Sequence, residues 1–273
     1  MPTTALAFAL AAAVFHALWN LLLARAPDVQ AATAVALITA EVVFAPVAVI
    51  VWRVDSGVWP WLVASSLLQL LYFGLLSVAY TRAPLSVVYP IARGGAPVIV
   101  LLVSVAVFGH ATSAGQVAGV VTIVIGILLV RGLTTSSTAG VVFGLAIAAC
   151  IASYTLVDSH GITYAAPIPY LELSMVVPTV VFAGTVIHRR GGAAVRAAVG
   201  AGSVTAGLAT FVAYAFVLAA LELASAASVA AVRETSVVIA TAFAAAVLHE
   251  RVGVARLAGA VLVVAGVALL ALT

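Results

Sequence analysis

Apolar windows of about twenty residues follow one another along nearly the whole chain, and this pattern limits the fold more than any other feature. Each window is long enough to cross the hydrocarbon core of a bilayer as a helix, which takes about 20 residues. Only 7% of the residues are charged, whereas a soluble domain usually carries about 25%. The sequence therefore predicts an all-α polytopic membrane protein. Ten windows can be placed, at about 4–24, 31–52, 59–80, 85–108, 112–131, 138–157, 167–188, 199–220, 224–248 and 252–272.

The two halves of the chain repeat each other. A shift of 140 residues aligns Arg93 with Arg233, and it also aligns two pairs of glycines, Gly119 with Gly259 and Gly126 with Gly266. We therefore interpret residues 1–135 and 136–273 as two five-helix repeats of one membrane unit. Because five is an odd number, the second repeat starts on the opposite side of the membrane. The halves are then inverted, an architecture that recurs in secondary transporters with the substrate site near the bilayer midplane.

Arginine is the only basic residue type apart from histidine, and its distribution indicates an orientation. Most arginines fall in loops that follow odd-numbered windows, whereas Arg53 falls on the other side. The positive-inside rule then places those loops in the cytoplasm and both termini outside. A net charge of +3 spread over loops forms no basic stripe, so we expect no nucleic-acid partner.

The sequence resembles the drug/metabolite transporter superfamily, in its EamA-type branch. The resemblance rests on "HALWNLLLAR", "YPIARGGAPVIVLLVSVAVFG" and "GQVAGVVTIVIGILLV" in the first half, and on "SYTLVDSHG" and "RETSVVIATAFAAAVLHERVGVARLAGAVLVVAGVALL" in the second. It implies a secondary carrier of small metabolites, often an exporter, with a central cavity lined by helices 1, 3, 4, 6, 8 and 9. Some members of the family are thought to keep both termini inside, which is the alternative to the orientation above.

Arg93 and Arg233 are the first candidates for substrate binding, together with Glu234, which follows Arg233. A charge near the bilayer centre costs about 2.5–3.5 kcal/mol on insertion scales, so each should face a cavity or a partner. Prolines and glycines beside Arg93 predict an interrupted helix, and interrupted helices are where carriers bind ligands. Two guanidinium groups could hold an anionic or zwitterionic substrate by bidentate bonds. The alternative is structural: each arginine neutralises a carboxylate such as Glu41, Glu172 or Glu234.

Three acidic residues are candidates for proton coupling. Glu41 followed by Pro46 matches Glu172 followed by Pro178 in the second half. Removal from water favours the neutral form of a carboxyl group, so these side chains could take up a proton, unless they are paired with arginine. Asp158 is the third candidate, although it could instead be a loop residue at a helix end.

Other polar and aromatic residues within the windows are candidates for the cavity wall. His16 and Asn20 lie four residues apart on one helix face, with Trp19 beside them, and Tyr154 and Asp158 repeat this spacing. Aromatic walls are the expected role of three further tyrosines, for which packing is the alternative: Tyr72, Tyr89 and Tyr214.

We predict a secondary transporter of a small polar metabolite, amino-acid-like or anionic, in the cell inner (plasma) membrane. Its partners are this small molecule and membrane lipid, and it is a monomer or a homodimer. A multidrug or cation exporter is the alternative, because acidic residues also lie in the windows; a membrane enzyme acting on lipid head groups is less favoured. The chain has no Walker motif and no GxSxG elbow, and "HERVG" lacks the second histidine of a zinc protease. We therefore expect no cofactor, metal site or catalytic residue.

Overall fold

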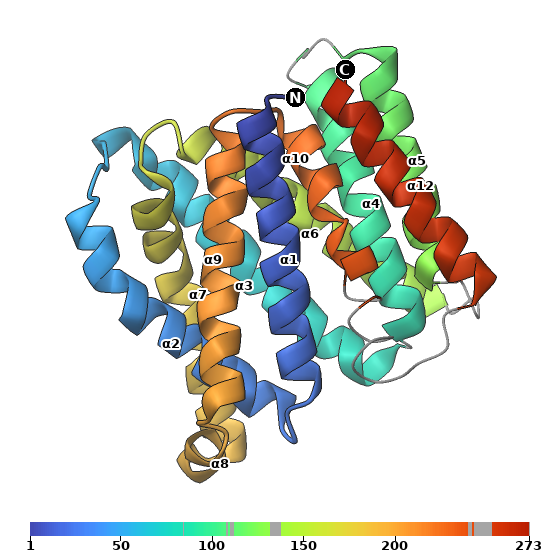
Figure 1. Cartoon of the computed structure of the whole chain (residues 1–273). Helices are drawn as coiled ribbons and strands as arrows, with labels where there is room; N and C mark the ends of the chain where they lie inside the picture. Colours follow the sequence, from blue (N-terminus) through green and yellow to red (C-terminus); the bar gives the residue numbers. More distant parts are fainter. Residues whose placement is uncertain are drawn as a thin grey trace.

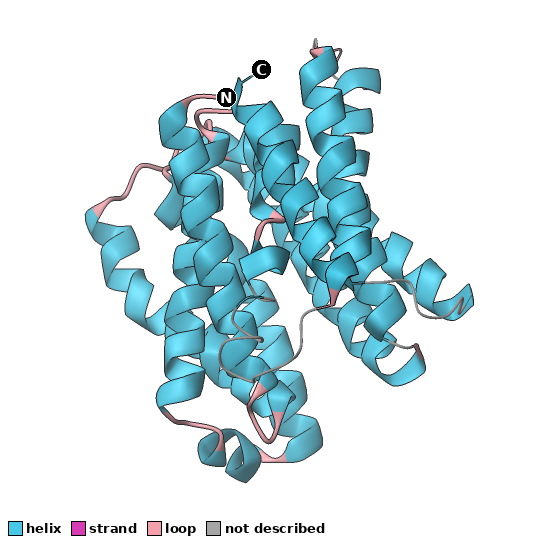
Figure 2. Ribbon diagram, turned by 45° about the vertical axis from the view of Figure 1, so that its right-hand side comes forward, coloured by secondary structure: helices cyan, strands magenta, loops and turns pink. Residues whose placement is uncertain are grey.

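The computed structural model describes residues 1–83, 85–107, 109, 112–131, 138–239, 242 and 253–272. This part of the chain is a bundle of helices with loops confined to its ends (Figures 1 and 2). The elements are α1 (Thr3–Ala24), α2 (Val29–Ile50), the 3-10 helix η1 (Ser56–Val58), α3 (Trp59–Arg82), α4 (Leu85–Ala106), α5 (Ala114–Arg131), α6 (Thr138–Gly161), α7 (Pro167–Arg190), α8 (Gly192–Ala197), α9 (Ala201–Leu221), α10 (Ala226–Arg233) and α12 (Val254–Leu272).

The distribution of side chains is that of a membrane protein. Large apolar side chains face outward, such as Ile50 at 82% and Val180 at 65% exposure, while polar side chains such as Ser65 and Thr155 are fully buried. This arrangement is stable in lipid, because lipid solvates apolar side chains, whereas polar side chains need hydrogen-bond partners inside the protein. Six of the described helices are long and apolar enough to span a bilayer, and three shorter apolar helices accompany them. The all-α membrane fold is confirmed; the count of ten spans stays a prediction, because the window 224–248 falls partly outside the described residues.

Helices of the two halves pack on one another in matched pairs. In chain order, α1, α2, α3, α4 and α5 of the first half correspond to α6, α7, α9, α10 and α12 of the second. The contact of α1 with α9 is therefore matched by that of α6 with α3, and the contact of α2 with α9 by that of α7 with α3. Three corresponding pairs pack directly on each other: α2 with α7, α4 with α10, and α5 with α12. If each helix is replaced by its counterpart in the other half, every one of these contacts becomes another observed contact or itself. A two-fold axis between the halves produces this pattern.

Glycines show the direction of α5 and α12, which lie side by side in Figure 1. A Cβ atom at Gly126 would lie 2.7 Å from the carbonyl oxygen of Gly259, and a Cβ atom at Gly266 would lie 2.7 Å from that of Gly119. The late glycine of each helix thus faces the early glycine of the other. The two helices are antiparallel, and their backbones approach closely because no side chain separates them.

The pair α2 and α7 is also antiparallel. Asp28 before α2 forms an ion pair with Arg190 at the end of α7, at 3.1 Å between Oδ2 and Nη1. At the other end, Val54 after α2 forms an isolated antiparallel bridge with Ala165 before α7. Corresponding helices therefore run in opposite directions, as an inverted arrangement of the halves requires.

The α5–α12 contact supports a stability prediction. We expect Gly126→Ala to lower the melting temperature of the detergent-solubilised protein, because its methyl group would clash with backbone of α12 at a cost of about 1–3 kcal/mol. Gly184→Ala on α7 is the matched control, since a Cβ there meets nothing within 4 Å. Alanine is the better helix former by about 1 kcal/mol, so the control should melt at the same temperature or higher. Equal melting of both variants would contradict the close backbone contact.

The predicted helix interruption occurs in only one half. Around Arg93, α4 stays helical from Leu85 to Ala106, so the expected break there is wrong. Pro97 removes one backbone donor but does not end the helix. In the second half, α10 ends at Arg233 and a turn follows at Glu234 and Thr235.

Candidate functional site

A polar group on α1 faces the interior of the bundle. Trp19 Nε1 lies 3.2 Å from His16 Nδ1, and Asn20 Nδ2 donates a hydrogen bond to the carbonyl oxygen of His16 at 2.8 Å. The His16 and Trp19 rings meet edge to face, with centroids 5.0 Å apart. The structure thus brings together three predicted site residues that lie within two turns of one helix.

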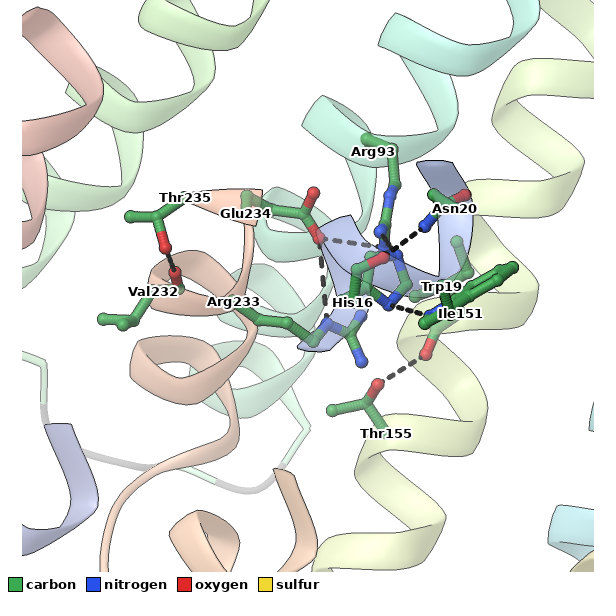
Figure 3. A network of polar contacts seen from close by, with 10 residues as sticks. All are labelled: His16, Trp19, Asn20, Arg93, Ile151, Thr155, Val232, Arg233, Glu234 and Thr235. Carbon is green, nitrogen blue, oxygen red and sulfur yellow. Dashed lines mark hydrogen bonds and ion pairs between the residues drawn. The ribbon is translucent and has the colours of Figure 1, made fainter. Parts of the chain in front are cut away.

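Arg93 reaches this group from α4. Its guanidinium contacts His16 Nε2, and its Nη1 lies 3.3 Å from Glu234 Oε1, with the two side chains 8% and 0% exposed. A guanidinium and an indole N–H can only donate, and a neutral imidazole has one acceptor nitrogen. His16 therefore accepts from either Arg93 or Trp19, and the Glu234 carboxylate accepts from Arg93. Figure 3 shows Arg93, His16 and Glu234 converging from α4, α1 and the end of α10.

Arg233 approaches the same carboxylate from α10. Its Nε lies 3.8 Å from Glu234 Oε1, so one carboxylate stands between the two arginines (Figure 3). The backbone there forms tighter bonds than an α-helix: Glu234 N–H donates to the Ala231 carbonyl at 3.1 Å, and Thr235 N–H donates to that of Val232 at 3.0 Å. This turn places adjacent side chains, Arg233 and Glu234, toward the same cluster.

The arginine cluster, which consists of Arg93, Arg233 and Glu234, has unused hydrogen-bonding capacity. Arg233 is 3% exposed, yet its Nε and Nη2 atoms have no hydrogen-bond partner in the part of the chain that the structure describes. Glu234 Oε2 and Ser236 Oγ are also buried and unpartnered there. A buried donor without an acceptor costs about 1–3 kcal/mol, and more when it is charged. Such a donor is therefore a place where a ligand can supply the acceptor.

A cavity of about 730 Å³ lies beside this cluster. Its volume is within the range of about 300–1,000 Å³ that small-molecule sites occupy. Its wall comes from α1–α4, α6, α7, α9 and α10. The eighth and ninth windows are α9 and α10, so this wall includes all six helices that the resemblance implies. Nine predicted site residues line it: His16, Trp19, Asn20, Glu41, Tyr72, Arg93, Tyr154, Tyr214 and Arg233.

Three tyrosines form a continuous part of this wall. The rings of Tyr72 and Tyr154 meet at 6.2 Å between centroids, and those of Tyr154 and Tyr214 at 6.0 Å, both edge to face. Edge-to-face pairs are a favoured geometry of aromatic rings, so the three side chains support one another. The fourth predicted tyrosine, Tyr89, lies in α4, but its side chain falls outside the described residues.

Asp158 is a buried helix residue, so its alternative interpretation as a loop residue is wrong. It lies in the last turn of α6 with 0% exposure. Its Oδ1 accepts a hydrogen bond from the Tyr170 hydroxyl at 2.8 Å, and its Oδ2 accepts one from the Tyr214 hydroxyl. The carboxylate thereby joins α6 to α7 and α9.

Glu41 and Glu172 meet across the contact of α2 with α7. Their carboxyl groups lie within hydrogen-bonding reach of each other, and Thr179 Oγ1 donates to Glu41 Oε1 at 3.5 Å. Glu41 lines the cavity, whereas Glu172 is only 9% exposed. Of the three carboxylates considered as arginine partners, Glu234 is the one that pairs with Arg93 and Arg233.

Sequence reasoning missed several residues of the cavity. Gln69 of α3 lines it and donates from Nε2 to Ser65 Oγ at 3.0 Å. An amide in the middle of an apolar window was a usable signal for this residue. Phe211 of α9 also lines the cavity and stacks on Phe44 at 4.0 Å between ring centroids. Nothing in the sequence distinguishes these two rings from packing residues.

The cavity reaches one end of the bundle. Its wall includes Asp28, Gln30 and Arg190, where α2 begins and α7 ends. Arg190 there forms an ion pair with Asp28, and its Nη2 donates to Gln30 Oε1 at 3.1 Å. We name this the open end, which is at the bottom of Figure 1.

At the opposite end, whose residues do not line the cavity, lie contacts that we name the latch. They are the Val54–Ala165 bridge and the ion pair of Arg53 Nη2 with Glu222 Oε1 at 3.3 Å. Two backbone hydrogen bonds flank the bridge, from Asp55 N–H to the Tyr164 carbonyl and from Ala166 N–H to the Arg53 carbonyl, each 2.8 Å. The latch connects the α2–α3 loop with the α6–α7 loop and with the end of α9.

These features define a class: a polytopic helical membrane protein with two matched halves around a central polar cavity. The sequence profile of the EamA-like transporter family matches residues 3–132 and again residues 138–272. The chain therefore belongs to the EamA-like transporter family, a branch of the drug/metabolite transporter superfamily, whose members are membrane transporters.

A similar fold is known from a solved structure, described as "Crystal structure of protein". It superposes on 99% of this chain and 97% of its own with a TM-score of 0.76, at 16% sequence identity. At that identity the likeness shows the fold alone. No curated protein matches the sequence.

Proposed function

We propose that the protein is a secondary transporter that moves a small anionic or amino-acid-like metabolite, as an exporter, through the central cavity. The observation that carries this proposal is the buried guanidinium edge of Arg233, which borders a cavity of about 730 Å³ and has no hydrogen-bond partner among the described residues. A carboxylate is the group whose two oxygens match such an edge by parallel hydrogen bonds.

The charge of the arginine cluster supports an anionic substrate. Two guanidinium groups share one carboxylate, so the cluster carries one excess positive charge. An uncompensated charge in a low-dielectric interior is costly, and a monoanionic group at Arg233 would remove that cost. Arg93 is already engaged by Glu234 and His16, which makes it a positioning residue rather than the direct anchor.

The rest of the wall fits a small polar molecule. Tyr72, Tyr154 and Tyr214 present ring faces and hydroxyl groups, while Asn20 and Gln69 present amides. A wall that is mostly apolar with a few polar groups is typical of metabolite sites, because the polar groups fix orientation. Asn20, Trp19 and His16 are then proposed to position the end of the substrate nearest α1.

The inverted halves support alternating access as the proposed mechanism. The cavity reaches the open end and not the latch, and corresponding helices run in opposite directions. Exchanging the conformations of the two halves would close the open end and release the latch, with the arginine cluster kept near the centre. Glu41, Glu172 and Asp158 are the carboxyl groups proposed to couple this exchange to protons.

A cation or multidrug exporter is the second candidate. Glu41 lines the cavity, and the three tyrosine rings could bind an organic cation by cation–π contacts. The excess positive charge at the arginine cluster disfavours this candidate, because it repels a cation that enters the same space.

The proposal is tested with purified protein in proteoliposomes and a panel of labelled compounds. We expect counterflow of amino acids or monocarboxylates, competed by other small carboxylates and not by quaternary ammonium compounds. Counterflow of quaternary ammonium compounds alone would establish the second candidate and overturn the first. We further propose that the protein acts as a multi-pass protein of the inner (plasma) membrane, as a monomer or homodimer, with membrane lipid and its substrate as partners.

A further inference from the structure

The glutamate pair, Glu41 and Glu172, is unusual because it joins corresponding positions of the two halves. Glu41 lies midway along α2 and Glu172 lies near the start of α7, and the antiparallel packing of these helices brings the carboxyl groups into hydrogen-bonding reach. Glu172 is nine-tenths buried, and its Oε2 has no hydrogen-bond partner among the described residues. Glu41 receives one long hydrogen bond, from Thr179 at 3.5 Å.

Two carboxylates in contact need a proton between them. An ionised carboxyl group can only accept hydrogen bonds, and two negative charges at this separation cannot both be kept away from water. When one of them is protonated, it donates to the other, and the pair carries one negative charge. The pair is thus a site for one shared proton, as in other carboxyl pairs that occupy one site.

The surrounding groups do not neutralise the pair. The other titratable side chains on or next to the helices packed against α2 and α7 are His16 and Arg25 of α1, Asp28, Arg53 and Asp55 at the ends of α2, Tyr72, Tyr80 and Arg82 of α3, Tyr164, Tyr170, His188, Arg189 and Arg190 of α7 and its start, Arg196 of α8, and Tyr214 and Glu222 of α9 and its end. Most of the charged ones lie at helix ends. At about 1.5 Å of rise per residue, Asp28 is about 20 Å from Glu41 and Arg190 is about 27 Å from Glu172 along their helices.

The position of the pair gives the shared proton a role. Glu41 borders the cavity, which reaches the open end, so water can deliver and remove the proton there. The pair also lies on the contact between the two halves. A protonated pair joins α2 to α7 by a hydrogen bond, whereas a doubly ionised pair pushes these helices apart.

We propose that Glu41 and Glu172 form one proton-binding site, in which a single shared proton holds α2 against α7 and is exchanged during the transport cycle. The inference deepens the proposed function and rests on it only for the transport cycle. Proton binding by the pair can be tested without transport.

Infrared difference spectroscopy of the purified protein, recorded across a pH titration, tests the shared proton directly. We expect a protonated-carboxyl band in the wild type that is lost in Glu41→Gln, in Glu172→Gln and in the double variant to the same extent. Glutamine mimics the protonated group and donates to the remaining carboxylate, so either single change removes the need for the proton. Arg196→Gln, on the exposed surface of α8, is the control and should keep the band. A double variant that loses twice the band of each single variant would show two independent acids and would overturn the proposal.

Transport in proteoliposomes separates this inference from the proposed function. We expect the rate to change with pH in the wild type and in Arg196→Gln, and to lose at least half of that change in both single glutamine variants. If the wild type transports none of the tested compounds but the variants still lose the infrared band, the proton site is supported and the proposed transport function is overturned. Unchanged pH dependence in both variants, or dependence on Na⁺ in place of pH, would overturn the proton role and leave the transporter.

Discussion

Replacing Arg233 with glutamine is expected to lower the rate of transport at low substrate concentration by about tenfold to a hundredfold, while the protein stays folded. A charge-assisted hydrogen bond contributes about 1.5–3 kcal/mol, and about 1.4 kcal/mol corresponds to a factor of ten. The fold should persist because Glu234 keeps its partner Arg93 at 3.3 Å. Initial uptake rates in proteoliposomes and melting temperatures of the purified variants measure the two effects.

Two further variants make this result specific. Arg196→Gln removes a guanidinium from the exposed surface of α8 and should change neither rate nor melting temperature. Arg93→Gln removes the main partner of Glu234, so it should lower both the rate and the melting temperature. A wild-type rate in Arg233→Gln would show that the substrate does not use this guanidinium, and the proposed anchor would be abandoned.

A disulfide across the latch is expected to stop transport completely. In the Val54–Ala165 bridge the flanking hydrogen bonds lie on the neighbouring residues, which makes it a non-hydrogen-bonded pair with an expected Cα separation of about 4.5 Å. Disulfides form at Cα separations of about 4.4–6.8 Å, so Val54→Cys with Ala165→Cys should cross-link without distortion. If alternating access requires the latch to open, the oxidised protein should be inactive and a reducing agent should restore its rate.

The natural cysteine must be removed for this experiment. Cys150 is the only cysteine and is buried in α6, so Cys150→Ala provides the background. The two single cysteine variants in that background are the controls and should transport in both oxidising and reducing conditions. Transport by fully cross-linked protein at the uncross-linked rate would show that the latch does not open during the cycle.

The two arginines are equivalent by repetition but not by environment. Arg93 contacts His16 and Glu234, whereas Arg233 keeps buried donors that no described residue uses. Symmetry of the backbone therefore does not impose symmetry on the chemistry, because Glu234 belongs to one half only and the first half has Gly94 at the corresponding position. Arg233 therefore has the donor edge that we propose for a ligand, whereas Arg93 is held by its two partners.

Much of the helical arrangement could be predicted. The windows 4–24, 31–52 and 59–80 are observed as α1, α2 and α3 with ends shifted by a few residues. The glycines that the repeat aligned, Gly126 and Gly266, lie in the contact between α5 and α12. Helices in lipid satisfy their own backbone, so local composition is enough to locate them.

The candidate site could be predicted only in part. The sequence identified polar residues in apolar windows, and nine of the predicted residues do line the cavity. It did not show that Glu234 is the partner of Arg93, which is 3.3 Å away although 141 positions separate them. It also did not show that Asp158 is held by Tyr170 and Tyr214, because these contacts depend on how helices rotate about their axes.

The sequence by itself determined that the protein lies in a membrane, where its helices lie and that its two halves repeat. Membrane burial and span length depend on local composition, which the sequence gives directly. The tertiary structure decided the pairings: Glu234 with the arginines, Glu41 with Glu172, and Val54 with Ala165. Each of these pairs joins helices or loops far apart in the chain. Which polar groups meet is set by the packing of whole helices, since a buried polar group takes whichever partner that packing brings within reach.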